Sequence, residues 1–182
     1  LDGDDKSDVI LQHSSGFNYA HIMDGLSATS AGAIPKQNSG YSSLGFPDLD
    51  GSNGADYVVQ HSGGYTFAYI QNGLTTSSSG SIPKAPADYT TLGFPNLDAT
   101  NGGDHVIQHS GGYTHAYLMN GTTLMSGGQI PGTPSGYMTL GFPDLDCDGN
   151  ADVVIEHSGG FRMAYLQSGL TTSSNASIPK LP

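Results

Sequence analysis

The stretch "GFPDLDCDGNADVVI", residues 141–155, places four aspartates within nine positions and then continues as a run of apolar residues. Neighbouring carboxylates repel one another at close range, so this density of negative charge needs a compensating partner. Its proline suits the end of one strand, and its β-branched run suits the start of another. The stretch therefore indicates two strands joined by an acidic loop.

Weaker versions of this stretch recur along the chain with a period of 48 residues. "LGFPDLD" at 140–146 also occurs at 44–50 and, as "LGFPNLD", at 92–98. "QHSGGYTFAYIQNG" at 60–73 returns as "QHSGGYTHAYLMNG" at 108–121. A fixed period of this length is the signature of a repeat architecture.

Each period contains four strand candidates separated by turn residues. In one period they cover 89–94, 104–110, 113–120 and a small-residue stretch that ends at 129–131. Gly-Gly and Asn-Gly pairs mark the tight turns between them. The two middle candidates are apolar at nearly every position, which favours sheets covered on both faces.

Four-stranded meanders repeated every ~40–50 residues are typical of β-propeller blades. We therefore predict an all-β fold, a β-propeller built from four 48-residue, four-stranded blades. A single unit would span 1–182, with repeats at 1–48, 49–96, 97–144 and 145–182. A solenoid is the structural alternative.

The first blade lacks its inner strand. The segment "SGYSSLGFPD" at 39–48 has two later counterparts, whereas every other strand occurs four times. Three explanations remain open: the chain is a piece of a longer propeller, another chain supplies the strand, or a few terminal residues are missing.

Composition narrows the classes of function. The net charge is −11 with only five Lys and Arg, which disfavours nucleic acid as a partner. No apolar run approaches ~18 residues, so we expect no transmembrane helix. No secretory signal is present, although a mature chain would have lost one. The one cysteine, Cys147, allows neither an internal disulfide nor a cysteine-based zinc site.

A calcium ion would explain the acidic loop, because calcium binds oxygen ligands supplied at alternate positions of a loop. Gly149 would permit the sharp turn within it. The candidate ligands at positions 1, 3, 5 and 9 are the side chains of Asp144, Asp146, Asp148 and Asp152, with the main-chain carbonyl of Asn150 at position 7. Ordinary metal-free Asp and Gly turns are the alternative.

The whole chain, repeat by repeat, resembles the FG-GAP (VCBS-type, integrin α-like) family, whose hallmark is a D-x-D-x-D-G-x-x-D calcium loop. That family forms seven-bladed propellers as a rule, which supports a fragment or an assembly; a closed four-bladed ring of hemopexin size is the rival. The chain departs from bacterial members in having no tryptophan.

Carried onto the other repeats, the resemblance implies up to four calcium ions, bound most strongly at 144–152. The second loop offers Asp48, Asp50, Ser52, the Gly54 carbonyl and Asp56. The third offers Asn96, Asp98, Thr100, the Gly102 carbonyl and Asp104. The first lacks position 1 and offers Asp2, Asp4, the Lys6 carbonyl and Asp8.

Histidines and tyrosines at repeated positions are candidate ligand-binding residues. They are His13, His61, His109 and His157 at the end of each second strand, and Tyr69, Tyr117 and Tyr165 in the third. Equivalent positions of a propeller lie far apart, so we favour turn capping for the histidines and inter-blade packing for most aromatic residues. Single-repeat residues such as Glu156 and Arg162 suggest no acid–base pair, and no activated nucleophile is recognisable, so we predict no enzyme.

The combined prediction is a secreted, calcium-stabilised binding or adhesion module. The FG-GAP family that the chain resembles includes lectins and integrin heads, so the resemblance allows glycan or protein ligands. We favour carbohydrate bound at repeated equivalent sites. A protein-interaction module or an accessory domain of a larger secreted enzyme is the alternative. A homo-oligomer could complete the propeller.

Overall fold

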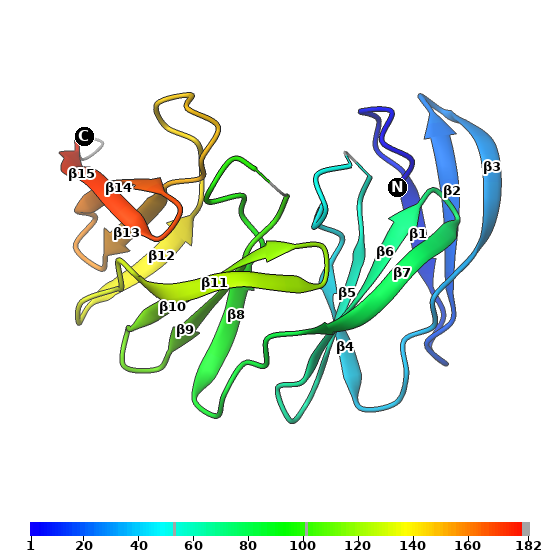
Figure 1. Ribbon diagram of the computed structural model, residues 1–182, viewed down its shortest axis with the longest axis horizontal. Coiled ribbons are helices and arrows are strands. Elements are labelled where there is room, and N and C mark those ends of the chain that lie inside the picture. Colours follow the sequence, from blue (N-terminus) through cyan, green and yellow to red (C-terminus); the bar gives the residue numbers. More distant parts are fainter. Residues whose placement is uncertain (53, 101, 180–182) are drawn as a thin grey trace. The chain divides into compact units, whose positions relative to one another are not determined.

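The computed structural model describes residues 1–52, 54–100 and 102–179, and this part of the chain is all-β (Figure 1). The last three residues of the predicted repeat 145–182 lie outside the described residues. Within the described ranges no helix is long and apolar enough to cross a membrane.

Four antiparallel sheets contain all the strands that the structure describes. The first sheet consists of β1 (Val9–Gln12), β2 (Asn18–Asp24) and β3 (Ser27–Ile34). The second consists of β4 (Tyr41–Gly45), β5 (Tyr57–His61), β6 (Thr66–Asn72) and β7 (Thr75–Ile82). The third consists of β8 (Tyr89–Gly93), β9 (His105–His109), β10 (Thr114–Asn120) and β11 (Thr123–Ile130). The fourth consists of β12 (Tyr137–Gly141), β13 (Val153–His157), β14 (Arg162–Ser168) and β15 (Thr171–Ile178).

The predicted fold class is confirmed. Neighbouring strands in each sheet are consecutive in the chain, so each sheet is a meander, as in a propeller blade, and not a coil of a solenoid. The first sheet has three strands because the counterpart of β4, β8 and β12 is missing, as the repeat pattern predicts. The prediction that 1–182 forms a single propeller stays a prediction.

Burial follows the sequence of each strand. The second strand of a complete sheet is β-branched or aromatic at its start, and Tyr57, Val58 and Val59 are fully or almost fully buried. The last strand is rich in Ser, Thr and Gly, and most of β7 is exposed. Small polar side chains bury little apolar area, so the outer edge of the sheet stays in contact with solvent.

The chain divides into two compact units, each with two sheets and its own core. Unit 1 comprises Leu1–Ala87 with Asn120–Thr123, and unit 2 comprises Asp88–Met119 with Leu124–Pro182. In unit 1 the core contains Leu1, Ala20, Ile22 and Ile34, against which Phe46, Ala55 and Leu74 pack. In unit 2 it contains Leu97, Val106, Ala116, Ile130, Ala151, Val153 and Ile155. Both cores join two sheets, so the sheets of a unit are held together by apolar side chains.

Candidate functional site

Each acidic loop lies between the first and second strands of its sheet and ends in an aspartate that anchors it. In the fourth loop the carboxylate of Asp152 accepts hydrogen bonds from the main-chain N–H of Leu145 and that of Gln167, both at 2.8 Å. Leu145 belongs to the loop and Gln167 to β14. The aspartate therefore connects the loop to the third strand of the sheet.

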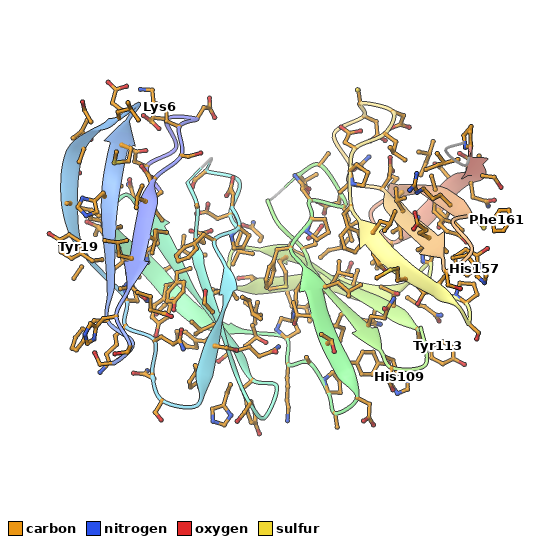
Figure 2. All side chains as sticks on the ribbon, turned by 180° about the vertical axis from the view of Figure 1, so that it is seen from behind. Lys6, Tyr19, His109, Tyr113, His157 and Phe161 are labelled. Carbon is orange, nitrogen blue, oxygen red and sulfur yellow. The ribbon has the colours of Figure 1, made fainter. Side chains whose placement is uncertain are left out.

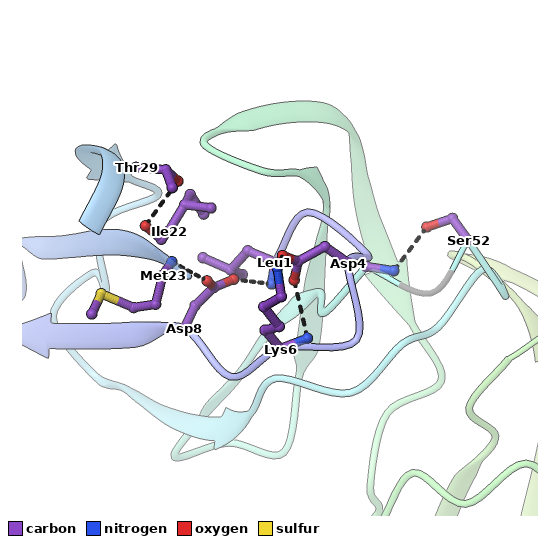
Figure 3. Close-up of polar contacts among 9 residues, drawn as sticks. Leu1, Asp4, Lys6, Asp8, Ile22, Met23, Thr29 and Ser52 are labelled. Atoms are coloured by element: carbon purple, nitrogen blue, oxygen red, sulfur yellow. Dashed lines mark hydrogen bonds and ion pairs between the residues drawn. The ribbon is translucent and has the colours of Figure 1, made fainter. Parts of the chain in front are cut away.

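The same two bonds recur in every repeat. Asp56 accepts from Leu49 and Gln71, and Asp104 accepts from Leu97 and Met119. Asp8 contacts the nitrogen of Leu1 and the N–H of Met23, which repeats the pattern (Figure 3). The ninth loop position therefore has a structural role whether or not a cation is bound.

Burial makes two of these aspartates costly to ionise. Removal from water raises the pKa of Asp56 to about 6, against the opposing effect of its two N–H donors, and the charges of Asp50 and Asp48 add to the rise. Burial likewise raises the pKa of Asp104 to about 6. Both side chains are completely excluded from solvent. A cation beside such a carboxylate would favour its ionised form.

The fourth loop is folded by its own carboxylates. Asp144 accepts from the N–H of Cys147 at 2.7 Å and from that of Gly149 at 3.1 Å. Asp148 accepts from the main-chain and side-chain nitrogens of Asn150, and the main-chain bond is the chief cause of the lowered pKa of Asp148. Partial desolvation, followed by the charge of Asp148, raises the pKa of Asp146. These bonds fix the turns of the loop around Asp144 and Asp148.

The second and fourth loops each gather three aspartates. Carboxylate oxygens of Asp48, Asp50 and Asp56 lie within 4.8 Å of one another, and so do those of Asp144, Asp146 and Asp152. Either acidic triad, as we term these two groups, could hold a metal ion. Asp148, which the sequence assigned to the fourth site, is not part of its triad.

The first and third loops differ from these two. In the first, Lys6 contacts Asp4 (Figure 3). Its ammonium lies 3.2 Å from the carboxylate of Asp4 and 3.1 Å from that of Asp24, so a side-chain cation already faces the loop. The third loop has two carboxylates, and its Asp98 accepts from the Thr100 hydroxyl at 2.7 Å. Neither loop forms an acidic triad within the described ranges. The calcium predictions for these two loops stay predictions.

A buried glutamine accompanies each acidic triad. Gln71 and Gln167 are at most 2% exposed, and their Oε1 atoms have no hydrogen-bond partner among the described residues. Gln71 lines a cavity of about 200 Å³ together with Asp50 and Ser52. The equivalent residues beside the first and third loops are Met23 and Met119. At this position of the repeat, a side-chain oxygen that could bind a cation is therefore present in the second and fourth repeats, where three aspartates converge, and absent from the first and third.

The repeated histidines cap turns. Nδ1 of His61, His109 and His157 accepts the N–H of the glycine two residues later at 2.9–3.0 Å. Nδ1 of His13 is 3.2 Å from the N–H of Ser15. These bonds confirm the capping interpretation.

The repeated tyrosines are half-buried and contact neighbouring side chains. Tyr69 stacks on Tyr57 with ring centroids 5.9 Å apart, and Tyr117 lies 5.9 Å from the buried ring of His105. The hydroxyl of Tyr165 faces the sulfur of Met163. Packing therefore engages all three predicted ligand-binding tyrosines.

The most exposed aromatic rings occupy a different position of the repeat. Phe17, Tyr65, Tyr113 and Phe161 are between 60% and 62% exposed. Figure 2 shows Tyr113 and Phe161 at the surface, beside His109 and His157 respectively. Lysine ammonium groups lie over Phe17 and Tyr65, at 4.4 and 4.2 Å from the ring centroids.

Two equivalent grooves lie near these rings, one in each unit. In unit 2 a groove of about 500 Å³ is lined mainly by residues 108–112 and 133–137. In unit 1 a groove of about 430 Å³ is lined by residues 12–16 and 36–41, which are the same repeat positions. Both are open and are bordered mostly by polar and glycine residues.

The non-repeated residues Glu156 and Arg162 pair with each other. They lie opposite one another on β13 and β14, and the guanidinium contacts the carboxylate. Each of the two side chains is thus the partner of the other across the strand pair.

Sheets and loops together define an all-β protein of propeller-like repeats. No protein-family model and no curated protein matches the chain. Among solved structures it is similar to BBS1N, as seen in the crystal structure of BBS1N in complex with ARL6DN, soaked with lead. The sequence identity is 14%, the TM-score is 0.42, and the match covers 96% of this chain and 53% of that chain. The chain therefore spans about half the length of that structure.

Sequence reasoning missed two features of the site. The exposed ring position could not be separated from the half-buried one, because both hold Phe or Tyr in the second, third and fourth repeats. The alternation of Gln71 and Gln167 with Met23 and Met119 was readable in the sequence, and it distinguishes the loops with triads from the others.

Proposed function

We propose that the chain is a non-enzymatic, extracellular binding module that two calcium ions stabilise and that takes carbohydrate as its ligand. The observation that carries the proposal is the pair of acidic triads at equivalent positions, each accompanied by a buried glutamine oxygen without a partner. A buried polar atom of this kind needs a partner, and a cation or its bound water supplies one.

Calcium suits this donor set better than other biological cations. Each triad offers carboxylate oxygens, and no histidine or cysteine belongs to it, which disfavours zinc and copper. Calcium accepts irregular oxygen coordination, whereas magnesium demands a near-ideal octahedron. The D-x-D-x-D-G-x-x-D pattern shared with FG-GAP repeats supports the same ion.

The aspartates of each triad would hold the ion, and the ion would supply compensation for their mutual repulsion. Asp56 and Asp152 also accept two N–H bonds each, so they connect the cation site to β6 and β14. Two ions would change the net charge from −11 to −7, since 2 × 2 is added to −11. Both effects favour the folded state.

The two grooves support carbohydrate as the ligand. Their linings are polar, with serine, threonine and main-chain groups that suit hydroxyl recognition. Tyr113, beside the unit 2 groove, presents a largely exposed ring on which a sugar can stack. Two equivalent shallow sites would act together through multivalency.

Calcium titration by isothermal calorimetry tests the metal part. We expect about two ions per chain, and one ion after either Asp48→Asn or Asp144→Asn. Asp88→Asn is the matched control, because Asp88 lies outside the loops in a left-handed conformation that asparagine tolerates. Unchanged stoichiometry in both loop variants would overturn the assignment.

A glycan array with the calcium-loaded protein tests the ligand. Reproducible hits that Tyr113→Ala weakens support carbohydrate binding. Silence on the array favours the second candidate, a protein-interaction module. Leu124 and Met125 favour that candidate, because both are at least 50% exposed on the outer strand β11.

A further inference from the structure

The first strand of the chain, β1, has an unpaired edge, whereas the equivalent edge is paired in each of the other three sheets. β1 (Val9–Gln12) pairs with β2 alone, whereas β5, β9 and β13 each pair with a second neighbour on the opposite side. β1 also ends before His13, while its counterparts include the equivalent histidine. An uncovered edge exposes main-chain N–H and C=O groups that can accept another strand.

We propose that this edge of β1 binds an extended peptide segment from outside residues 1–182 that carries the pattern Tyr-x-x-Leu-Gly-Phe-Pro, as an antiparallel fourth strand. The pattern is shared by all three segments that cover the equivalent edges, at 41–47, 89–95 and 137–143. Strand addition of this kind gains affinity from main-chain bonds and specificity from alternate side chains.

The complete sheets define the register of the added strand. Tyr41 pairs with His61 and Ser43 with Val59, and the register then shifts before Gly45 pairs with Val58. The same pairing and the same shift recur between β8 and β9 and between β12 and β13. The incoming tyrosine would therefore lie opposite His13 and the glycine opposite Ile10.

β1 lacks two aromatic contacts that its counterparts in the complete sheets make with the inner strand. In complete sheets the tyrosine packs on the histidine, with ring centroids 4.9–5.1 Å apart. The phenylalanine of the pattern stacks on the first residue of the next strand, as Phe46 does on Tyr57 at 4.9 Å. The corresponding residues of the first sheet are His13 and Val9, and Val9 is 44% exposed.

An apolar hollow lies on the same face of the first sheet. It measures about 370 Å³ and is lined by residues that include Leu11, His13, Phe17 and Tyr19. Leu11 is 54% exposed, whereas its counterparts Val59, Ile107 and Ile155 are at most 3% exposed. The added tyrosine and phenylalanine would point to this face, because directly opposed residues share a face of the sheet.

The acidic loop supplies a further unused donor. In the other repeats the N–H of the ninth loop residue donates to the proline carbonyl of the inner-strand segment, as Asp56 does to Pro47 at 2.6 Å. The described residues provide no such acceptor for the N–H of Asp8. The proline at the end of the proposed segment would provide it.

A peptide from outside is favoured over a second copy of the chain. Each of the three inner strands of the chain is already paired in its own sheet. Within residues 1–182, the other edge strands of a second copy are β1, β3, β7, β11 and β15, and none of them carries the Tyr-x-x-Leu-Gly-Phe-Pro pattern.

The test uses a synthetic peptide with the sequence of residues 40–48, GYSSLGFPD, added to the protein of residues 1–182. Calorimetry should show saturable binding with one peptide per chain, in calcium and in chelator alike, so the result does not depend on the proposed metal sites. Amide hydrogen exchange of residues 8–13 should slow on binding. A peptide carrying Ser43→Pro and Phe46→Asp is the matched control and should not bind.

Protein variants locate the site. Leu11→Asp should weaken binding roughly tenfold or more, which corresponds to ~1.4 kcal/mol. Leu26→Asp is the control, because Leu26 is fully exposed at the β2–β3 turn, and it should leave binding unchanged. No binding of GYSSLGFPD, equal binding of both peptides, or dimers that Leu11→Asp dissociates would overturn the proposal.

Discussion

At the residue scale, the left-handed positions of the acidic loops show where the sequence is under strain. The fourth position of the loop has a positive φ in every repeat: Gly3, Gly51, Ala99 and Cys147. Glycine adopts this conformation without steric cost, whereas a side chain is disfavoured there by roughly 1–2 kcal/mol. The first and second loops therefore have glycine at this position, whereas the third and fourth have alanine and cysteine, which are disfavoured there.

Replacing Cys147 by glycine should stabilise the protein. The φ of Cys147 is 62°, the side chain is exposed, and the equivalent Gly51 shows that glycine fits the loop. We expect a gain of about 0.5–1 kcal/mol, reduced from the full strain by the greater freedom of glycine in the unfolded chain. Urea unfolding in chelator measures it. Ser110→Gly, at an exposed residue without positive φ, should give no gain.

The pH dependence of stability should report the buried aspartates. The pKa of Asp104 is about 6 in the folded protein and 3.8 in the reference state, so the folded state binds more protons between these values. Its contribution therefore destabilises the protein at pH 7 and is relieved as the pH falls toward 4. Asp56 acts in the same direction.

In chelator we thus expect the melting temperature to rise by a few degrees between pH 7 and pH 5. Asp104→Asn should flatten this rise, although it lowers stability at both values by disturbing two N–H bonds. A melting temperature that falls from pH 7 to pH 5, with the same slope in the variant, would contradict the assignment.

At the element scale, the aspartates at positions 9 and 1 of the fourth loop, Asp152 and Asp144, have separable roles. Asp152 joins the loop to β14 through Leu145 and Gln167, whereas the hydrogen bonds of Asp144 stay inside the loop. Loss of two bonds to a buried carboxylate costs about 3–5 kcal/mol. The strand connection therefore depends on Asp152 even without a cation.

Asp152→Ala should unfold far more easily than Asp144→Ala in chelator. The first variant should lose about 3–5 kcal/mol and the second no more than about 1 kcal/mol. Calcium should stabilise the wild type more than either variant. Urea titrations with and without calcium measure both effects, and equal losses in chelator would show that Asp152 has no separate structural role.

The elements themselves were largely predictable. The 48-residue period predicts the strands, because the same pattern of apolar and turn residues recurs in each repeat. The missing strand of the first sheet follows because its segment occurs three times and every other strand segment four times. The bond from Gln167 to Asp152 was not predictable, since this donor lies 15 residues away at the irregularity of β14. The partner of Tyr69, the ring of Tyr57, was also hidden, because alternate residues of a strand covered on both faces look alike in sequence.

At the scale of the whole molecule, the two units divide the acidic triads between them. Unit 1 contains Asp48, Asp50 and Asp56, and unit 2 contains Asp144, Asp146 and Asp152. Each unit joins two sheets through its own core. A cation bound in one unit should therefore stabilise chiefly the sheets of that unit.

Hydrogen exchange of the loop variants should reveal this division. With Asp144→Asn, calcium should no longer slow exchange in unit 2, at residues 88–100, 102–119 and 124–179, but should still slow it in unit 1, at residues 1–52 and 54–87; with Asp48→Asn the pattern should reverse. The physical reason is that binding free energy protects only the amides that open together with the site. Asp88→Asn should retain calcium-dependent protection throughout. Loss of protection in both units from one substitution would instead mean that the four sheets open as one cooperative body, because a cation in either triad would then stabilise every amide equally.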